Sequence, residues 1–430
     1  MIPDIAPVET SNSFPDTTSV VIIGGGIVGL SAALSLSERG IPVILLEKGK
    51  IAAEQSSRNQ GWVRKTSRSA PDLPMAIAAD KMWADMPARV GAQVGYNPAG
   101  VMFLAKTEEE MAGHDAWLKS AEAYSLGSRL LSQREIDEKV PGGAENWAGA
   151  IFTASDGCAE PSLASSAIAA AAIRKGAIIV ENCAVRTLSL TGGKVTGVVT
   201  ERGEIQCEQV LLAGGLWSRR FLGNMGVTLP ILPLTLSVIR TAPMEGPTDI
   251  AMGGPDFSFR RRNDGGYTIT QRGAVNSPIT LDHLLVGRHF LPALKHQRKF
   301  LRISFGKEFF DDIALGRRWK ATSISPFEKI RTMDPPVNGG INAEAMRNVS
   351  AAWPVFANAP IAQVWAGTMD ITPDSLPVVG PVAKLPGLMI ASGFSGHGFG
   401  TGPAAGQLAA DLLCGLDPIV DPAPYAFDRF

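Results

Sequence analysis

The clearest pattern of apolar and polar positions lies near the start of the chain. Residues 19–23 form a short β-branched run, which is typical of a buried parallel strand. A glycine-rich stretch, residues 24–29, leads into residues 30–39, whose apolar side chains recur at helical spacing before Gly40. A second apolar run at residues 43–46 predicts another strand. The pattern therefore predicts a complete β-α-β unit.

The glycines of this unit each have a mechanical function. Gly24 permits a tight turn, Gly26 lets the backbone approach a pyrophosphate, and Gly29 lets the helix pack closely on the strand. The N-terminus of the helix then presents free N–H groups and the positive end of the helix dipole to the phosphates, and Ile27 and Val28 are also expected to contact the cofactor. The turn is therefore expected to bind a dinucleotide.

An acidic residue closes the unit. Glu47 ends the second strand, 21 residues beyond Gly26. A carboxylate at this place accepts hydrogen bonds from a ribose diol and disfavours a 2′-phosphate. The strands, the turn, the helix and the carboxylate together predict a dinucleotide site, but they do not distinguish FAD from NAD.

Five later stretches distinguish between the two cofactors. They are residues 52–61, 156–161, 210–218, 365–380 and 393–400. In this order they resemble the segment under the flavin, the DGxxxP element, the (V/L)xAAGxWS strand and turn, the WxG…TPDxxPxxG stretch and the GxxGHGF turn of the D-amino-acid oxidase superfamily. The chain therefore resembles FAD-dependent oxidoreductases of that superfamily, and within it the glycine oxidase, sarcosine oxidase and D-amino-acid dehydrogenase group.

The resemblance implies an α/β fold with two domains, a discontinuous Rossmann-like FAD-binding domain and a substrate domain with an antiparallel sheet and helices. A hydrophobic share of 45% and a charged share of 19% fit a large folded core. Helices are predicted over residues 281–303 and 403–413, and a hairpin turn at residues 263–266. The expected boundaries are 19–65, 150–225 and 360–415 for the FAD-binding domain, 66–149 and 226–359 for the substrate domain, 1–18 for a flexible tail and 416–430 for a C-terminal tail.

The resemblance also implies which positions contact FAD. Val185 would meet the adenine through backbone groups, and the N-terminus of the helix predicted at 403–413 would face the flavin pyrimidine. Monomeric sarcosine oxidases attach FAD through a cysteine, but residues 365–369 contain none, so FAD is expected to be non-covalent. The other expected contacts are Lys48, Ser56, Ser57, Asn59, Gln60, Gly61, Ala213, Gly214, Trp217, Gly367, Asp374, Gly393, Gly396, His397, Gly398, Phe399, Gly400 and Thr401.

The chemistry that the resemblance implies is oxidation of a primary or secondary amine, such as an amino acid or an N-substituted amino acid. Hydride passes from the C–H bond beside the amine to flavin N5, and the resulting imine hydrolyses. Arginine suits the clamp for the substrate carboxylate, because a guanidinium binds a carboxylate bidentately. Arg64, Arg260 and Arg272 are candidates, together with Tyr267 on the same predicted strand as Arg272, and each could instead lie away from the pocket.

His397 is the histidine that lies within a motif near the cofactor. It could contact the flavin or the substrate, or it could stabilise a tight turn. As a general base it would suit an alternative function, an FAD-dependent 2-hydroxy-acid dehydrogenase. A second alternative is the flavin subunit of a hetero-oligomeric dehydrogenase. Sarcosine oxidases carry lysine where this chain has Gly400, which leaves open whether O2 or an electron-accepting partner reoxidises the flavin.

Charge and cysteine content limit the partners. The 40 basic and 41 acidic residues give a net charge of −1, which disfavours nucleic-acid binding, including an RNA-modifying function. Four widely separated cysteines match no zinc or Fe–S pattern, so we expect no metal. They also fit a reducing compartment, and we expect a cytoplasmic location.

Membrane contact is expected at most at the surface. No apolar run approaches the roughly 20 residues of a transmembrane helix, and the first residues lack a signal-peptide pattern. Residues 288–302 interleave basic and apolar side chains. This pattern fits a helix in peripheral contact with a membrane, or one solvated face of an ordinary helix.

Overall fold

The β-branched run near the start of the chain forms strand β1 (Thr17–Ile23), and the second apolar run forms β2 (Val43–Leu46). The two strands pair in parallel, and helix α1 (Ile27–Glu38) connects them. The predicted β-α-β unit is therefore confirmed.

Close backbone contacts explain the glycines of its turn. Gly24 has a φ of +114°, and a Cβ atom on it would lie 2.4 Å from the carbonyl oxygen of Ala213. A Cβ atom on Gly29 would lie 2.2 Å from the carbonyl oxygen of Gly24. Any side chain at either position would collide with the backbone, so both positions require glycine.

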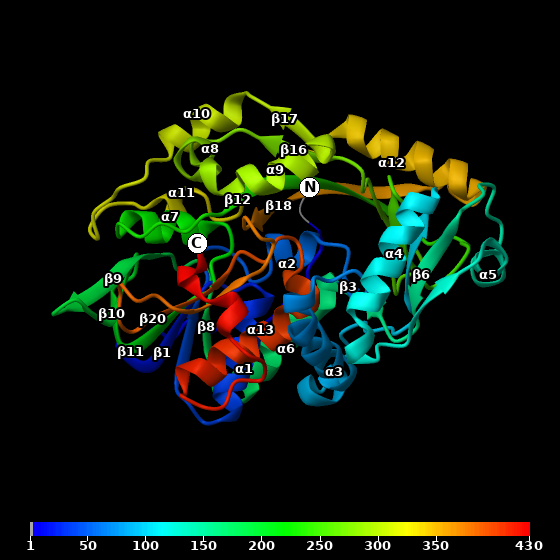
Figure 1. Cartoon of the computed structure of the whole chain (residues 1–430). Helices are drawn as coiled ribbons and strands as arrows, with labels where there is room; N and C mark the ends of the chain where they lie inside the picture. The colour runs from blue at the N-terminus through cyan, green and yellow to red at the C-terminus, as the bar shows by residue number, and fades with distance from the viewer. Residues whose placement is uncertain (1–2) are drawn as a thin grey trace.

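The computed structural model describes residues 3–430, and within this range the strands form an eight-stranded, a ten-stranded and a two-stranded sheet. The eight-stranded sheet has the order β19-β20-β11-β1-β2-β8, with β10 paired to β11 and β9 paired to β10. It lies in the lower half of the molecule in Figure 1. Its further strands are β8 (Ile178–Val180), β9 (Val185–Thr191), β10 (Lys194–Thr200), β11 (Glu204–Leu212), β19 (Val378–Pro381) and β20 (Leu388–Ser392).

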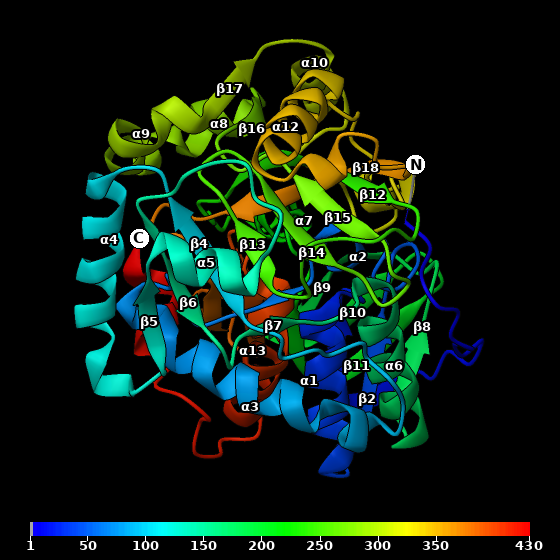
Figure 2. The ribbon, with the colours of Figure 1, turned by 90° about the vertical axis from the view of Figure 1, so that its right-hand side faces the viewer.

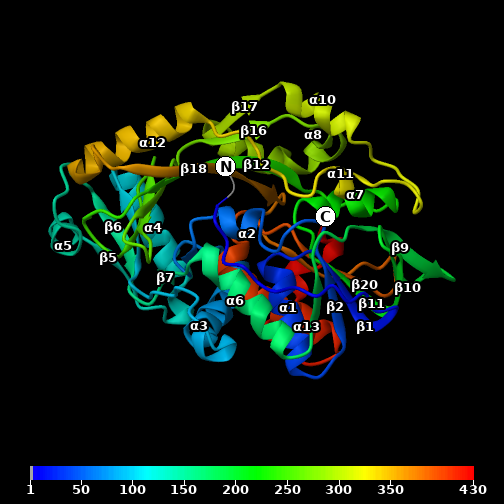
Figure 3. The ribbon, with the colours of Figure 1, turned by 180° about the vertical axis from the view of Figure 1, so that it is seen from behind.

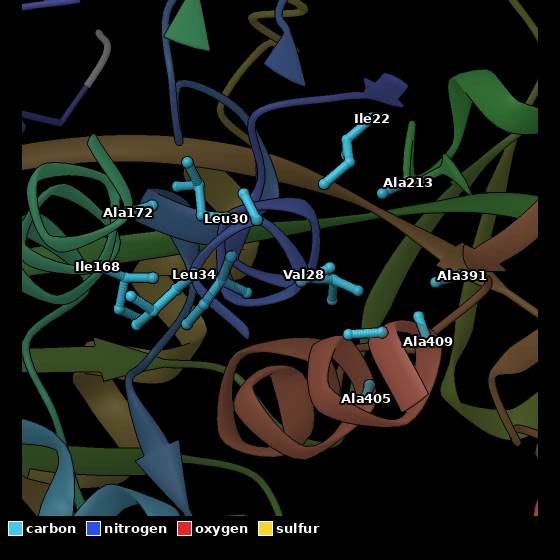
Figure 4. Packing of buried hydrophobic residues seen from close by; sticks show 14 of the residues in the cluster. Ile22, Val28, Leu30, Leu34, Ile168, Ala172, Ala213, Ala391, Ala405 and Ala409 are labelled. Carbon is cyan, nitrogen blue, oxygen red and sulfur yellow. The ribbon is translucent and has the colours of Figure 1, made fainter. Parts of the chain in front are cut away.

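Helices α6 (Pro161–Arg174) and α13 (Gly398–Leu413) pack on either side of α1. Figure 4 shows Leu34 of α1 beside Ile168 of α6, and Ala405 and Ala409 of α13 beneath Val28. Helix α13 was expected to begin at residue 403, but it begins five residues earlier, with Pro403 inside it. Its N-terminus therefore lies within the predicted glycine-rich turn itself.

Small residues allow α1 and α13 to approach closely. Gly406 of α13 faces α1, where an added Cβ would lie 2.6 Å from Ser31 Cβ and 2.7 Å from the Val28 carbonyl oxygen. The two helices carry segments that are distant in sequence, so this contact fixes the last helix of the chain against the first.

The ten-stranded sheet crosses the top of the molecule, at β12 and β18, and continues down one side, at β6, in Figures 1 and 3. Its long central pair is antiparallel, β12 (Leu232–Thr241) with β18 (Ile361–Ile371). Residues 361–371 therefore lie in this sheet, although the expected boundary assigned them to the FAD-binding domain. Its other strands are β4 (Val101–Ala105), β5 (Ser128–Leu131), β6 (Gly149–Thr153), β13 (Ala251–Gly253), β14 (Ser258–Arg261), β15 (Tyr267–Thr270), β16 (Val275–Pro278) and β17 (Leu301–Ser304).

The hairpin predicted at residues 263–266 is present, because β14 and β15 pair antiparallel around it and Gly265 has a φ of +83°. The single helix predicted over 281–303 is not. Gly287 and Pro292 interrupt it, so that α8 (Leu281–Val286) and α9 (Leu291–Gln297) are separate and β17 follows. The other helices are α2 (Gln55–Arg58), α3 (Leu73–Val90), α4 (Glu108–Ser120), α5 (Gln133–Lys139), α7 (Trp217–Asn224), α10 (Lys307–Ala314), α11 (Pro326–Lys329) and α12 (Gly339–Ala352).

Residues near both ends of the chain pack on the rest of the molecule, including part of the segment 1–18 that was expected to form a flexible tail. Ala6 N donates to the Ser162 carbonyl at 2.9 Å, and Ser11 N donates to the Ile179 carbonyl at 2.8 Å. Residues 1 and 2 lie outside the described residues. Near the other end, Tyr425 is buried. Among the helices in residues 3–430, none has the length and apolar character needed to cross a membrane.

The α1–α13 contact gives a testable prediction. Gly406→Ala should lower the free energy of unfolding by about 1–3 kcal/mol, because the new methyl group overpacks the interface. The matched control is Gly223→Ala in α7, where a Cβ meets nothing within 4 Å and stability should stay the same or rise. Urea unfolding of the two variants measures the difference. Equal stability of both variants would show that the helices can move apart without cost.

Candidate active site

A cavity lies between the two large sheets, at the carboxyl ends of β1, β2 and β11. Both sheets contribute to its wall, since Leu236 comes from β12 and Met369 from β18. The expected FAD contacts that line it are Gly24, Gly26, Ile27, Val28, Glu47, Lys48, Ser56, Asn59, Gln60, Gly61, Val185, Ala213, Gly214, Trp217, Gly367, Gly396, His397, Gly398, Phe399 and Gly400. The arrangement brings segments from the whole length of the chain to one elongated site.

Five expected contacts lie behind this wall instead. They are Gly29, Ser57, Asp374, Gly393 and Thr401. Asp374 differs most from the expectation, because its carboxylate pairs with Arg429 at 2.8 Å. It also accepts a hydrogen bond from Leu376 N at 3.0 Å, and so stabilises a turn.

One end of the cavity presents the groups that a dinucleotide requires. Gly26 caps α1 without a side chain, and Ile27 N donates to Ser56 Oγ at 2.9 Å. Glu47 accepts hydrogen bonds from Gly25 N and Gly49 N, both at 2.7 Å. Burial raises the pKa of Glu47, and the nearby Lys48 and the two N–H groups oppose that shift. The carboxylate is thus held in one orientation at the edge of the cavity.

Residues 327–331 close the same end of the cavity, although no sequence motif linked them to the cofactor. Phe327 and Arg331 line the cavity, although residues 226–359 were expected to serve the substrate. Arg331 donates to the Lys48 carbonyl at 2.9 Å and to Glu201 at 2.6 Å. No local motif marks this segment, because its place depends on tertiary contacts alone.

At the other end, the backbone of α13 meets strand β3 (Trp62–Val63). A Cβ atom on Gly400 would lie 2.6 Å from the Trp62 carbonyl oxygen. Trp83 Nε1 also donates to the Gly400 carbonyl at 2.8 Å. A lysine, which sarcosine oxidases carry here, could not occupy this position in the present chain without moving the backbone.

Asp370 is a cavity residue that sequence reasoning missed, since it lies between two matched parts of one motif. It is buried, and burial raises its pKa to about 6. One carboxyl oxygen, Oδ2, accepts from Gly393 N at 2.7 Å, whereas Oδ1 has no hydrogen-bond partner among the described residues. A buried unpaired acceptor is costly, so the site fits a ligand that supplies hydroxyl donors, as FAD does along its ribityl chain.

Charged side chains gather beside the start of α13. Arg68 lies 3.4 Å from Asp72, and His397 Nδ1 lies 3.8 Å from the same carboxylate. Burial, with the nearby Arg68 and Arg64, holds the pKa of His397 well below its usual range. The imidazole is therefore neutral near pH 7. The Arg64 guanidinium lies 5.2 Å from the centre of the Phe103 ring and also lines the cavity.

A second cavity of about 210 Å³ adjoins the first, and the two share Gln60, Trp62, Leu236 and Met369. Arg272 lies on its wall. The residues that complete the wall are Ser258, Thr270, Gln271, Ala274 and Val275. The second cavity has a size and a position that suit a small substrate beside the cofactor.

Arg272 is the cation of the second cavity. Its guanidinium lies 4.3 Å from the centre of the Phe103 ring, and Nη1 donates to the Gly254 carbonyl at 2.9 Å. Surrounding protein lowers its pKa to about 10, yet the side chain remains exposed through the open cavity. Within residues 3–430 it forms no ion pair with a carboxylate.

Arg260 and Tyr267 line neither cavity, contrary to expectation. Arg260 shares a strand face with Ser258, but Glu160 covers it with an ion pair at 2.5 Å, and its Nε donates to the Gln60 carbonyl. Tyr267 is buried, and its hydroxyl donates to the Thr248 carbonyl at 3.1 Å. Side chains alternate between the two faces of a strand, so the sequence predicts that Ser258 and Arg260 share a face. It cannot predict which residue from another part of the chain covers either side chain.

The chain is similar to known flavin enzymes over nearly its whole length. The chain is 27% identical over 415 residues to a glycine oxidase of Pseudomonas aeruginosa, covering 95% of this chain and 98% of that protein. It is 24% identical over 435 residues to the mitochondrial sarcosine dehydrogenase of Mus musculus, covering 99% of this chain and 43% of that protein.

A solved structure agrees over the whole chain. The L-amino acid deaminase of Proteus myxofaciens, in complex with anthranilate, superposes with a TM-score of 0.96 and 32% identity, covering 100% of this chain and 97% of that one. The model of the FAD dependent oxidoreductase family, DAO, matches residues 19–412. These matches confirm the FAD-dependent oxidoreductase fold and cofactor predicted from the motifs, and the chain belongs to the DAO family of FAD-dependent oxidoreductases, whose members oxidise amino acids and amines.

Proposed function

We propose that this enzyme oxidises an amino acid or an N-substituted amino acid, and that Arg272 binds the substrate carboxylate. The observation that carries the proposal is the unpaired guanidinium of Arg272 in a cavity next to the cofactor cavity. A guanidinium that opens into a cavity without a carboxylate partner can bind a substrate carboxylate with bidentate geometry. A solved relative was determined in complex with anthranilate, a carboxylate with an adjacent amine, which supports a substrate of this class.

The remaining wall suits the rest of such a substrate. Trp62, Leu236 and Met369 give apolar surface where the two cavities meet. Gln60 adds a polar group there, and its amide donates to Ser258 Oγ at 2.7 Å, which fixes the side chain. We therefore expect the carboxylate at Arg272 and the amine-bearing carbon toward the shared part of the two cavities.

The cofactor residues have separate roles in this proposal. Glu47 accepts hydrogen bonds from the adenosine ribose, the N-terminus of α1 faces the pyrophosphate, and Asp370 accepts from a ribityl hydroxyl. Bound FAD supplies the hydride acceptor. None of the cysteines, all of which are free in the described chain, lines the cavity, which supports non-covalent FAD.

His397 has a positioning role rather than a catalytic one in this proposal. Its low pKa keeps it neutral, and it occupies the N-cap position of α13 beside the cavity. An amine substrate can enter in its neutral form and therefore needs no protein base, whereas an alcohol does. We further propose a cytoplasmic location, and O2 or an electron-accepting partner as the oxidant of reduced FAD.

The first prediction tests the substrate clamp. Arg272→Ala should lower the efficiency of anaerobic flavin reduction by amino acids at least tenfold, because the charge-assisted hydrogen bonds of a guanidinium to a carboxylate contribute about 1.5–3 kcal/mol. Arg261→Ala is the matched control, because Arg261 lies near the surface beside Asp249 and should have little effect. Both variants should stay yellow. If Arg272→Ala retains efficiency within threefold, the carboxylate binds elsewhere or the substrate lacks one.

The second prediction concerns the cofactor. Acid precipitation should release all the yellow colour into the supernatant, and colour left on the precipitated chain would contradict non-covalent binding. Glu47→Ala should weaken FAD binding by about 1.5–3 kcal/mol, through loss of charged hydrogen bonds. Titration of the apoprotein with FAD measures the change, with Glu138→Ala, which removes an exposed carboxylate far from the cavity, as a control.

The third prediction separates amine from alcohol oxidation. His397→Asn should retain FAD and lose less than about tenfold in the rate of flavin reduction, since a general base typically contributes about 10²–10⁴-fold. The rate should rise with pH as the substrate ammonium deprotonates. A thousandfold loss with normal FAD content would favour a hydroxy acid as substrate.

A further inference from the structure

The strongest feature outside the active site is a group of exposed apolar side chains on residues 281–314. This segment, which we call the outer platform, comprises α8, α9, β17 and α10. Figures 1 and 2 show these elements together at the top of the molecule, away from the FAD-binding sheet. Its exposed large apolar residues are Leu284, Leu285, Leu291, Leu294, Phe300, Ile303, Phe305, Phe310 and Ile313. A water-soluble protein seldom leaves so large an apolar surface uncovered without a partner.

The orientation of each platform element determines which of its apolar side chains are exposed. Asp282 and Val286 lie one turn apart on α8, and Val286 is buried, so the opposite side presents Leu284 at 71% exposure. Phe305, Phe309 and Phe310 form a cluster, with ring centres 5.0 to 5.9 Å apart. Phe305 is 65% exposed and Phe310 is 60% exposed. Phenylalanine rings thus pack on one another at the surface rather than in a core.

An ion-pair network fastens the platform to the FAD-binding domain. Asp282 of α8 pairs with Arg219 at 2.5 Å and with Arg317 at 2.7 Å. Asp312 of α10 pairs with Arg317 at 2.7 Å and also with Arg220. Arg219 and Arg220 belong to α7, whose first residue, Trp217, lines the cofactor cavity. The platform therefore has a defined orientation relative to the cofactor site.

The charge of the platform favours one class of partner. Residues 281–313 contain six basic and four acidic side chains, whereas the whole chain is nearly balanced. Two of the four acids, Asp282 and Asp312, face inward in the network above. Arg288, Lys295, Arg298 and Lys299 are exposed, and among the described residues none of them forms an ion pair. Exposed apolar groups surrounded by cations match a bilayer that carries anionic lipids.

We propose that the outer platform docks the enzyme on the surface of an anionic lipid membrane. This extends the contact expected over residues 288–302 to α8 and α10, and it does not depend on the substrate proposed above. A second copy of the chain fits less well, because a two-fold interface would bring the same basic side chains together.

Cosedimentation of the FAD-loaded protein with vesicles tests the proposal. The protein should bind vesicles of phosphatidylcholine mixed with phosphatidylglycerol, and bind pure phosphatidylcholine vesicles much more weakly. Phe305→Ser combined with Phe310→Ser should weaken binding at least tenfold. Leu190→Ser combined with Ile361→Ser, which removes exposed apolar groups elsewhere, should leave it unchanged. Lys295→Gln combined with Lys299→Gln should weaken it about thirtyfold.

Two further measurements complete the test. Flavin reduction in solution should stay the same in all of these variants, which shows that they fold. High salt should weaken binding of the wild-type protein, since surface charges are screened. The proposal fails if the wild-type protein ignores anionic vesicles, if the control pair loses as much binding as the phenylalanine pair, or if light scattering finds a dimer that the phenylalanine pair dissociates.

Discussion

The cofactor cavity depends on the close approach of backbones that lie far apart in sequence. Gly24 meets the Ala213 carbonyl, and Gly400 meets the Trp62 carbonyl, each at a distance that excludes a Cβ atom. These contacts bring the start, the middle and the end of the chain to one site. Side chains at those positions would separate the strands and helices whose ends form the wall. The high glycine content of the chain is thus partly a requirement of the site.

The arginines near the site divide into two kinds by their partners. Arg260 pairs with Glu160, and Arg68 lies beside Asp72, so their charges are balanced within the protein. Arg64 and Arg272 lie near the Phe103 ring and pair with no carboxylate in the described part of the chain. A balanced guanidinium supports the structure, because its charge is already compensated. An unbalanced one leaves a charge for a ligand to neutralise.

The sequence predicted the parts of the fold and site that depend on local rules. The β-α-β unit follows from apolar periodicity and the glycine turn, and most expected FAD contacts line the cavity because they belong to motifs. Asp370 and Arg331 were missed since their roles come from tertiary contacts. The alternation of side chains along β14 could not show that Arg260 forms an ion pair with Glu160, which comes from a distant part of the chain. Likewise, the apolar and basic pattern of 281–303 predicted a helix, whereas Gly287 and Pro292 divide it.

The path of the chain between the two sheets has a consequence for synthesis. Strand β1 pairs with β11, which also pairs with β20, and β12 pairs with β18 across more than a hundred intervening residues. Neither sheet can be completed until residues 361–392 have left the ribosome. The growing chain must therefore carry unpaired strand edges for most of its translation, when aggregation is a hazard and chaperones can bind. Two contiguous domains would fold one after the other, whereas here the last part of the chain completes both.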